Sequence, residues 1–358
     1  LSGVDFDHER DLLINLITEV EKLRDMDGIE VVSISDALDL VEVIMSDILG
    51  FVDTEKATQV VNIVEVLLGS QILRTAFKDV YQALVYPMVE GMVGELANLE
   101  AIDNADIIAD FDALIEILRS ALDFGAIDVV KGEAIRFDRV EEVQTIVRKL
   151  FGLNILNAKI EEIIDYVADM ITFVDLSTID ASALDLAADG ELFALAYEKL
   201  AVVLTHDAFP IKDISFSFSL DIDSLLDAYV NETTIEQVLD ALRYLSDMTI
   251  LREALPIALD FAKDLVPADF AFIVEYDGLT KADLIADVKS VVEVLQEVVN
   301  LGAVDLYLTR DMNLQNLTPL KNIIERLFNL NLLSGKFDDL AITALSFVGI
   351  DEDFYNSL

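Results

Sequence analysis

The chain of 358 residues contains no cysteine and no tryptophan, and only two histidines. Without cysteine it can form no disulfide and no thiolate metal site, and it has no cysteine nucleophile. The two histidines, His8 and His206, lie in unrelated sequence settings, which gives no support to a histidine metal site or a Ser-His-Asp arrangement. A cysteine-free chain fits an exported protein, although many cytosolic proteins also lack cysteine, and we expect an extracellular or cell-surface location.

Basic residues are scarce, because 24 Lys and Arg stand against 68 Asp and Glu, for a formal net charge of −44. A nucleic-acid-binding protein neutralises phosphates with a basic patch, and no such cluster occurs in the sequence. An anionic membrane surface repels the chain for the same reason. The partners that the charge allows are cations and basic proteins or peptides.

Long uncharged apolar runs are also missing. The longest approach to one, residues 192–204, is interrupted by Glu198 and Lys199, so we expect no membrane insertion. The N-terminus is acidic from the start and has no signal-peptide pattern, and because it begins with Leu it indicates a processed product or a fragment. Hydrophobic residues still make up 54% of the chain, which predicts a folded core kept soluble by acidic faces.

The common catalytic motifs are absent, among them HExxH, GxSxG, GxGxxG and GxxxxGK[ST]. Pairs of carboxylates occur throughout so acidic a chain, so no pair identifies a glycosidase-type site. Two acidic stretches that end at Gly28 and Gly190 resemble calcium loops but lack the ligands at positions 1, 3 or 12 that an EF-hand requires. The sequence therefore predicts no enzyme and no catalytic, cofactor-binding or metal residue, and leaves diffuse binding of Ca²⁺ or other cations between acidic faces open.

What the sequence does contain is one short phrase written four times. LLGSQIL at 67–73 is followed by LFGLNIL at 150–156, LSDMTIL at 245–251 and LFNLNLL at 327–333. Amphipathic helical patterns run up to the phrase and leave it again, so it predicts a helix–turn–helix corner. None of its columns carries one ionisable residue type four times, which indicates an architectural element and not a repeated catalytic site.

Specific positions of the phrase predict how the corner is made. Gly69, Gly152, Asp247 and Asn329 share a column and suit the left-handed or turn geometry of a helix end. Two positions later, Asn154, Thr249 and Asn331 share a column whose side-chain oxygens are expected to cap the next helix, with Ser70 serving in the first copy.

A longer match supports the interpretation of the phrase as part of an internal repeat. Residues 105–163 align with 282–340 without a gap, and seventeen of the fifty-nine positions are identical. The identities include Asp110 with Asp287 in the first helix and Gly125 with Gly302 at its end. Such self-similarity predicts tandem modules.

The predicted fold is mainly α, with four helical modules at 1–95, 96–175, 176–268 and 269–358. Each module has a long first helix, a partly extended connection and the corner. The first helices are expected at 6–25, 104–124, about 183–204 and 280–301. Short strands are expected in the connections, at 29–35, 127–137, 213–222 and 304–309, with a further candidate at 270–276 and an extra helix at 36–49. Stacked modules give either an elongated array or a compact closed arrangement.

These patterns favour a non-enzymatic structural protein, which acts as a spacer, a cell-surface coat or a filament subunit. We expect self-association or a neighbouring protein as its partner. The alternative is a helical-repeat binding module that docks a basic protein or peptide, with the acidic surface steering association.

Overall fold

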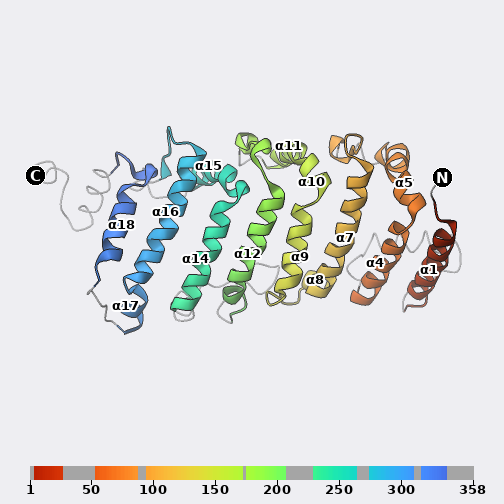
Figure 1. Ribbon diagram of the computed structural model, residues 1–358, viewed down its shortest axis with the longest axis horizontal. Coiled ribbons are helices and arrows are strands. Elements are labelled where there is room, and N and C mark those ends of the chain that lie inside the picture. The colour runs from red at the N-terminus through yellow and green to blue at the C-terminus, as the bar shows by residue number, and fades with distance from the viewer. Residues whose placement is uncertain are drawn as a thin grey trace, which may run out of the picture. The chain divides into compact units, whose positions relative to one another are not determined.

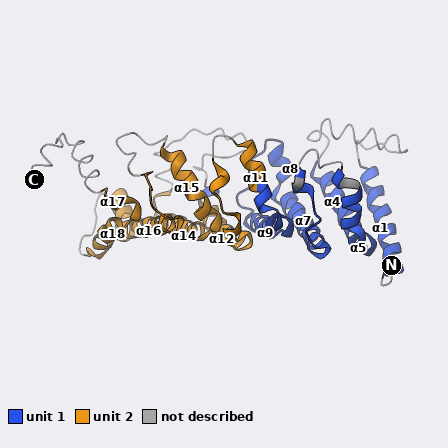
Figure 2. Ribbon diagram, turned by 90° about the horizontal axis from the view of Figure 1, so that it is seen from above, with its two compact units in different colours: residues 1–163, 204–221 blue, residues 164–203, 222–358 orange. Residues whose placement is uncertain are grey.

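The computed structural model describes residues 4–26, 53–87, 94–171, 175–206, 229–263, 274–309 and 316–336. The chain divides into two compact units, as Figure 2 shows. The first contains residues 1–163 and 204–221, and the second contains residues 164–203 and 222–358. The division into four modules stays a prediction.

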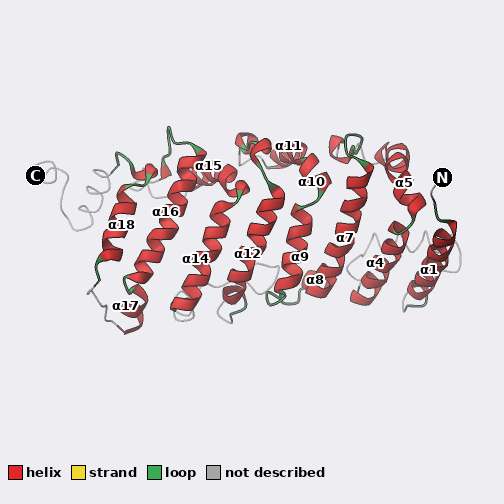
Figure 3. Ribbon diagram, viewed as in Figure 1, coloured by secondary structure: helices red, strands yellow, loops and turns green. Residues whose placement is uncertain are grey.

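The predicted mainly α fold is confirmed. The described residues form fourteen α-helices and a few short 3-10 or π turns, and no strand occurs among them (Figure 3). The α-helices are α1 (Phe6–Arg24), α4 (Thr54–Leu68), α5 (Gln71–Val80), α7 (Asn104–Phe124), α8 (Ala126–Val130), α9 (Val140–Phe151), α10 (Asn154–Ala158), α11 (Ile160–Met170), α12 (Leu186–Leu204), α14 (Glu232–Asp247), α15 (Thr249–Lys263), α16 (Lys281–Asn300), α17 (Ala303–Thr309) and α18 (Thr318–Phe328).

The ends of the long helices follow from local chemistry. Asp5 accepts hydrogen bonds from the first N–H groups of α1, and Thr280 forms a reciprocal capping box with Asp283 at the start of α16. Helix α7 ends at Gly125, whose φ of 91° is the left-handed conformation that glycine adopts most cheaply. Gly302 has a φ of 93° directly after α16, so both long helices stop where the sequence predicted.

Two of the predicted strands are helices. Residues 127–130 lie in α8 and residues 304–309 lie in α17, while 133–137 are irregular. A short apolar run fits a buried helical turn as well as a strand, and here it packs one residue, Val129 or Val304, into the core. Residues 274–276 form no strand, and the candidates at 29–35, 36–49 and 213–222 lie outside the described residues.

In the first unit the long helices α1, α4, α7 and α9 lie side by side in chain order, and each contacts the next (Figure 1). Val61 and Leu68 of α4 pack against Ile115 of α7, and Val64 and Leu122 extend this cluster. A second cluster around Ile107 joins the start of α7 to α5, in part through an edge-to-face contact between Phe77 and Phe111.

In the second unit α14, α16 and α18 lie side by side in the same way (Figure 1), and α15 contacts both α14 and α16. The most deeply buried apolar side chains of this unit come from the long helices, including Ala194, Leu239, Leu284 and Val292. Each unit is therefore a layer of long helices. Helices α5 and α10 in the first unit and α15 in the second lie at one end of the layer, and α8 and α17 lie at the other end (Figure 1).

The crossing helices are produced by the corners that the repeated phrase predicted. The axis of α4 and that of the following segment, 71–83, differ by 90° across Gly69 and Ser70. Within the described ranges no single helix is long and apolar enough to cross a membrane, and this bent pair is the one combination that meets the length and composition together.

Candidate functional site

Four buried carboxylates occupy equivalent places at the four corners. Each comes from the first long helix of its segment, and each accepts hydrogen bonds from the backbone of the fifth and sixth residues of the phrase. The four are Glu9, Asp110, Asp189 and Asp287, and all are buried. A buried acid is uncommon unless it is paired or fully hydrogen-bonded, so these groups are the natural place to look for function.

The corner after α9 shows the arrangement clearly. Asp110 of α7 accepts the N–H of Asn154 at 2.7 Å and the N–H of Ile155 at 2.6 Å. The side-chain amide of Asn154 donates to the same carboxylate at 2.9 Å. One side chain thus ties the start of α10 to the first turns of α7.

The corner after α18 repeats these contacts. Asp287 of α16 accepts the N–H of Asn331 at 2.8 Å and that of Leu332 at 2.6 Å, and the Asn331 side-chain amide donates at 3.0 Å. Because Asp110 aligns with Asp287 and Asn154 with Asn331, the matching residues of the two aligned segments make matching contacts.

The other two corners use different side chains for the same contacts. Asp189 of α12 accepts the N–H groups of Thr249 and Ile250 at 2.6 Å and 2.8 Å, and the Thr249 hydroxyl replaces the asparagine amide at 2.7 Å. Glu9 of α1 accepts the N–H groups of Gln71 and Ile72 at 2.5 Å and 3.4 Å and the Ser70 hydroxyl at 2.7 Å.

Hydrogen bonding favours the charged form of the carboxylate at the first corner. The Ser70 hydroxyl, which donates to Glu9, lowers the pKa of that carboxyl below its usual value. Burial opposes this effect, and the N–H groups of Gln71 and Ile72 add to it. An ionised acid also suits this place electrostatically, because the N-terminus of a helix carries partial positive charge and unpaired N–H donors.

The predicted local caps are therefore wrong at three of the four corners. Asn154 makes no capping hydrogen bond to its own helix and donates to Asp110, and Asn331 donates to Asp287 in the same way. Thr249 donates its hydroxyl to Asp189. A charged acceptor forms the stronger hydrogen bond, so the distant carboxylate takes the place of the local side chain. Ser70 caps α5 as predicted, by accepting the N–H of Leu73.

The shared turn column has turn geometry but not the left-handed conformation. Gly69 and Gly152 have φ values of −69° and −84°, and Asn329 has −97°. These angles are open to any residue, which explains why asparagine and aspartate stand in the same column as glycine.

The repeated phrase does not identify the carboxylates, because they lie outside it. Asp110 and Asn154 are 44 residues apart, as are Asp287 and Asn331. The identity of Asp110 with Asp287 was the available signal, since an acid shared by two amphipathic helices needs a reason. The role of Asp110 depends on the tertiary contact between the first helix and the corner.

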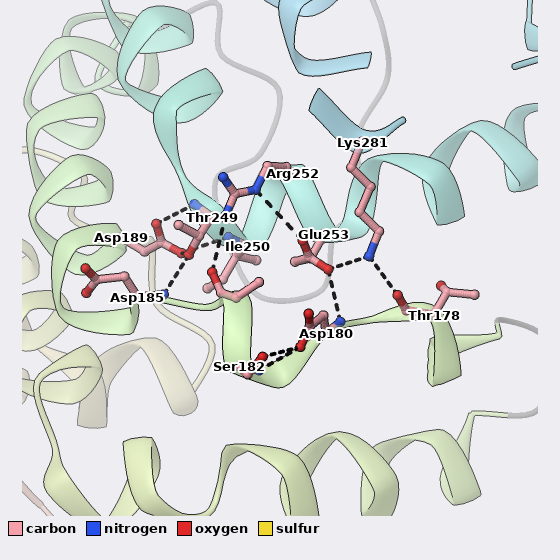
Figure 4. A network of polar contacts seen from close by, with 11 residues as sticks. Thr178, Asp180, Ser182, Asp185, Asp189, Thr249, Ile250, Arg252, Glu253 and Lys281 are labelled. Carbon is pink, nitrogen blue, oxygen red and sulfur yellow. Dashed lines mark hydrogen bonds and ion pairs between the residues drawn. The ribbon is translucent and has the colours of Figure 1, made fainter. Parts of the chain in front are cut away.

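A second buried acid holds the segment before α12 in the second unit (Figure 4). Glu253 of α15 accepts the N–H of Asp180 at 3.0 Å and pairs with the ammonium group of Lys281 from α16. Lys281 also donates to the carbonyl of Thr178 at 2.7 Å. Three separate chain segments therefore meet at one carboxylate.

Polar side chains also connect neighbouring long helices. Arg119 of α7 donates to Asn62 of α4 at 3.0 Å and pairs with Glu65. In the second unit Arg243 of α14 donates to Gln296 of α16 at 2.9 Å. Counted from the phrase, Glu65 of α4 is equivalent to Arg243 of α14, and in the aligned first helices Arg119 of α7 is equivalent to Gln296 of α16. The arginine of the contact therefore lies on the first helix in the first unit and on the helix before the corner in the second.

Asp185 and Asp189, the acidic residues of the calcium-loop-like stretch that ends at Gly190, have structural roles. Asp189 belongs to the corner just described, and Asp185 accepts the N–H of Ala188 at the start of α12. His8 lies beside the first corner, with Nε2 3.4 Å from the carbonyl of Gly69. Within the described ranges no group of three or more His, Asp or Glu side chains is arranged to hold a metal ion.

An apolar groove of about 510 Å³ lies among α12, α14, α16 and α17 in the second unit. Its walls are almost entirely aliphatic, apart from Tyr229 and Thr234. It contains no carboxylate, amide or imidazole that would orient a polar substrate, so it offers no chemistry of its own.

Comparisons of the chain with protein-family models, with characterised proteins and with solved structures found no match. Function is therefore argued from geometry. At each corner the oxygens of the buried carboxylate already accept two backbone N–H groups and one side-chain donor, so this arrangement is suited to fixing helices and not to holding a substrate.

Proposed function

We propose that the protein is a non-enzymatic structural protein built from four tandem acidic helical modules, which acts as a spacer, a cell-surface coat or a filament subunit outside the cell. The observation that carries the proposal is the fourfold corner. Four of the six buried acids in the described ranges accept hydrogen bonds that join one helix to the segment after the corner.

The proposed module consists of a first helix with its buried acid, a connection of variable length and the corner. Modules of this kind stack by burying their helical faces against each other, and stability comes from each contact between neighbours. A net charge of −44 keeps the resulting surface soluble and makes association between copies depend on screening of that charge.

Light scattering after size exclusion tests the proposal, at low salt, at high salt and with millimolar Ca²⁺. The expected result is a mass that rises well above 39.7 kDa as the charge is screened or calcium is added. A chain that stays monomeric under all three conditions contradicts the coat and filament roles and leaves the spacer. Defined turnover of a small-molecule substrate contradicts the whole proposal.

The alternative is a binding module for a basic protein or peptide, and its support is the large excess of acidic residues. Such a complex would form quickly at low salt and weaken steeply as salt is added. A partner whose affinity for the chain does not change with salt contradicts this alternative.

A further inference from the structure

The α1 face turned away from α4 is apolar and exposed. Leu13, Ile14 and Ile17 lie there, and each is more than half exposed. The corner acids give a common register for comparing this face with the other first helices. The residue five positions after the acid is Ile115 in α7, Ala194 in α12 and Val292 in α16, with exposures of 7%, 0% and 4%. In α1 the same position is Ile14, which is 57% exposed.

The α18 face turned away from α16 is also apolar and exposed. Leu317, Leu320 and Ile324 are exposed along it. Counted from the phrase, Ile324 is equivalent to Val64 of α4, which packs on the cluster that joins α4 to α7. Helix α18 therefore carries an apolar surface of the kind that α4 presents to α7, without a following first helix among the described residues.

Within the chain, these two kinds of face pack on each other. Helix α4 contacts α7 and helix α14 contacts α16. In both units, the helix that leads into a corner therefore packs on the first helix of the following segment. Arg119 in the second half of α7 donates to Asn62 in the middle of α4, and Arg74 of α5, just beyond the C-terminal end of α4, pairs with Asp112 in the first half of α7. Helices α4 and α7 therefore run antiparallel. Among the described residues α1 and α18 lack this packing, and two examples in the same molecule define it.

Two charges on these faces also complement each other. Lys321 of α18, which forms an exposed ion pair with Glu325 of the same helix at 3.4 Å, takes the place of the buried Val61 of α4 and Leu239 of α14. Glu21 of α1 takes the place of Leu122 of α7, which packs on the cluster that contains Val61. Where α4 and α7 have the apolar residues Val61 and Leu122, the equivalent places hold a basic residue on α18 and an acidic residue on α1.

We propose that α18 of one copy packs on α1 of a second copy in the way that α4 packs on α7, with Ile324 against Ile14 and Lys321 opposite Glu21. This inference rests on the proposed structural function and names its interface. The contact joins two different surfaces, so it is heterologous, and each added copy presents the same two surfaces again. Association of this kind adds copies in one direction and is open-ended when its rotation does not close a ring, as a filament or coat requires.

The test compares the full-length protein with two variants that each lose one face. The first carries Ile14→Asp and Ile17→Asp, and the second carries Ile324→Asp. Leu308→Asp, at an exposed apolar residue of α17, is the matched control. Masses are measured by analytical ultracentrifugation at rising protein concentration in about 0.15 M salt, where charges more than about 8 Å apart are largely screened. Circular dichroism confirms that each variant is folded.

Head-to-tail packing predicts a specific pattern of masses. The wild type and the Leu308→Asp control grow with concentration, each face variant alone stays near 39.7 kDa, and an equimolar mixture of the two gives a complex of two chains and no more. A face variant that associates as strongly as the wild type, or a mixture that remains monomeric, overturns the proposed interface.

Charge exchange gives a second, independent readout. Lys321→Glu and Glu21→Lys are each expected to weaken association at least tenfold, and the double variant is expected to restore most of it. Failure of the double variant to restore association overturns the pairing of Lys321 with Glu21. If the wild type assembles and no face variant changes it, this interface is wrong while the proposed function stands. If the wild type never assembles, both the interface and the coat and filament roles fail.

Discussion

The backbone N–H of Ile155 donates to Oδ2 of Asp110 at 2.6 Å, across 45 residues of chain. This bond and its neighbour from Asn154 close a loop that contains most of α7, all of α8 and all of α9. The same loop closure occurs at the other three corners, with 44 to 63 residues between the partners. Each corner is therefore held by a long-range contact and not only by its own turn.

Replacement of Asp110 by alanine is expected to destabilise the first unit by about 3 kcal/mol, because two backbone N–H groups and one amide lose a buried acceptor. Asp110→Asn is expected to cost less, since its amide oxygen can still accept one of these bonds. Urea unfolding measures the loss, and faster hydrogen exchange at the Asn154 and Ile155 amides locates it. Asp123→Asn, at an exposed acid of the same helix, is the control and is expected to change neither.

The stability of the first unit should depend on the ionisation of Glu9. Hydrogen bonds to Ser70, Gln71 and Ile72 hold its pKa below the usual value, so folding favours the charged form. The stabilisation is present above the unfolded pKa of about 4.3 and is lost as the pH falls through the lower folded pKa.

The stability difference between the wild type and Glu9→Gln is therefore expected to be largest near neutral pH and to narrow below about pH 4.3. Urea unfolding at a series of pH values measures it. Glu133→Gln, in the exposed connection after α8, is the control. A difference that stays constant down to the acid transition would show that the charge of Glu9 does not contribute.

The left-handed end of α7 gives a backbone prediction. Gly125 has a φ of 91°, and a residue with a Cβ atom is strained there. Gly125→Ala is expected to destabilise the fold by roughly 1–2 kcal/mol. Gly125→Asn is expected to cost less, because asparagine tolerates this conformation better. Thermal unfolding of both variants checks the order, and equal losses would show that conformation is not the cause.

The buried carboxylate of Glu253 makes the ammonium of Lys281 important for stability. Lys281→Met leaves Glu253 buried with the N–H of Asp180 and a longer ion pair with Arg252 at 3.8 Å, and about 2 kcal/mol of stability is expected to be lost. Lys289→Met removes an exposed ion pair with Asp247 and is expected to cost less than about 0.5 kcal/mol.

A double-mutant cycle separates the pair from its surroundings. Lys281→Met combined with Glu253→Gln is expected to cost less than the sum of the two single changes, because the uncompensated charge has been removed. Additive losses would mean that the two side chains stabilise the unit independently. Urea unfolding of the four proteins supplies the comparison.

The long helices could be predicted from the sequence because their signals are local. The expected helix at 104–124 matches α7, and 6–25 and 280–301 match α1 and α16 to within one residue at either end. Amphipathic spacing, capping residues and the terminal glycines fixed them. The short runs at 127–130 and 304–309 carry too few residues to separate helix from strand, and tertiary contacts decided them.

The corner carboxylates could not be predicted because their role depends on contact between distant segments. Asp110 lies in the first third of an acidic amphipathic helix, where hydropathy alone places an acid in solvent. The burial of Asp110 is favourable because its carboxylate accepts the N–H groups at the N-terminus of α10, which have no partner within that helix. The role of Glu9 was less predictable than that of Asp110, because the first corner uses a glutamate where the other three use an aspartate.

The contacts between neighbouring long helices also restrict which helix can stand beside which. Glu65 of α4 meets Arg119 of α7, whereas at the equivalent place Arg243 of α14 meets Gln296 of α16. If α14 stood in front of α7, Arg243 would face Arg119, and two cations would be brought together where an ion pair now stands. These side chains therefore disfavour the replacement of α4 by α14 beside α7, although the two helices have similar shapes.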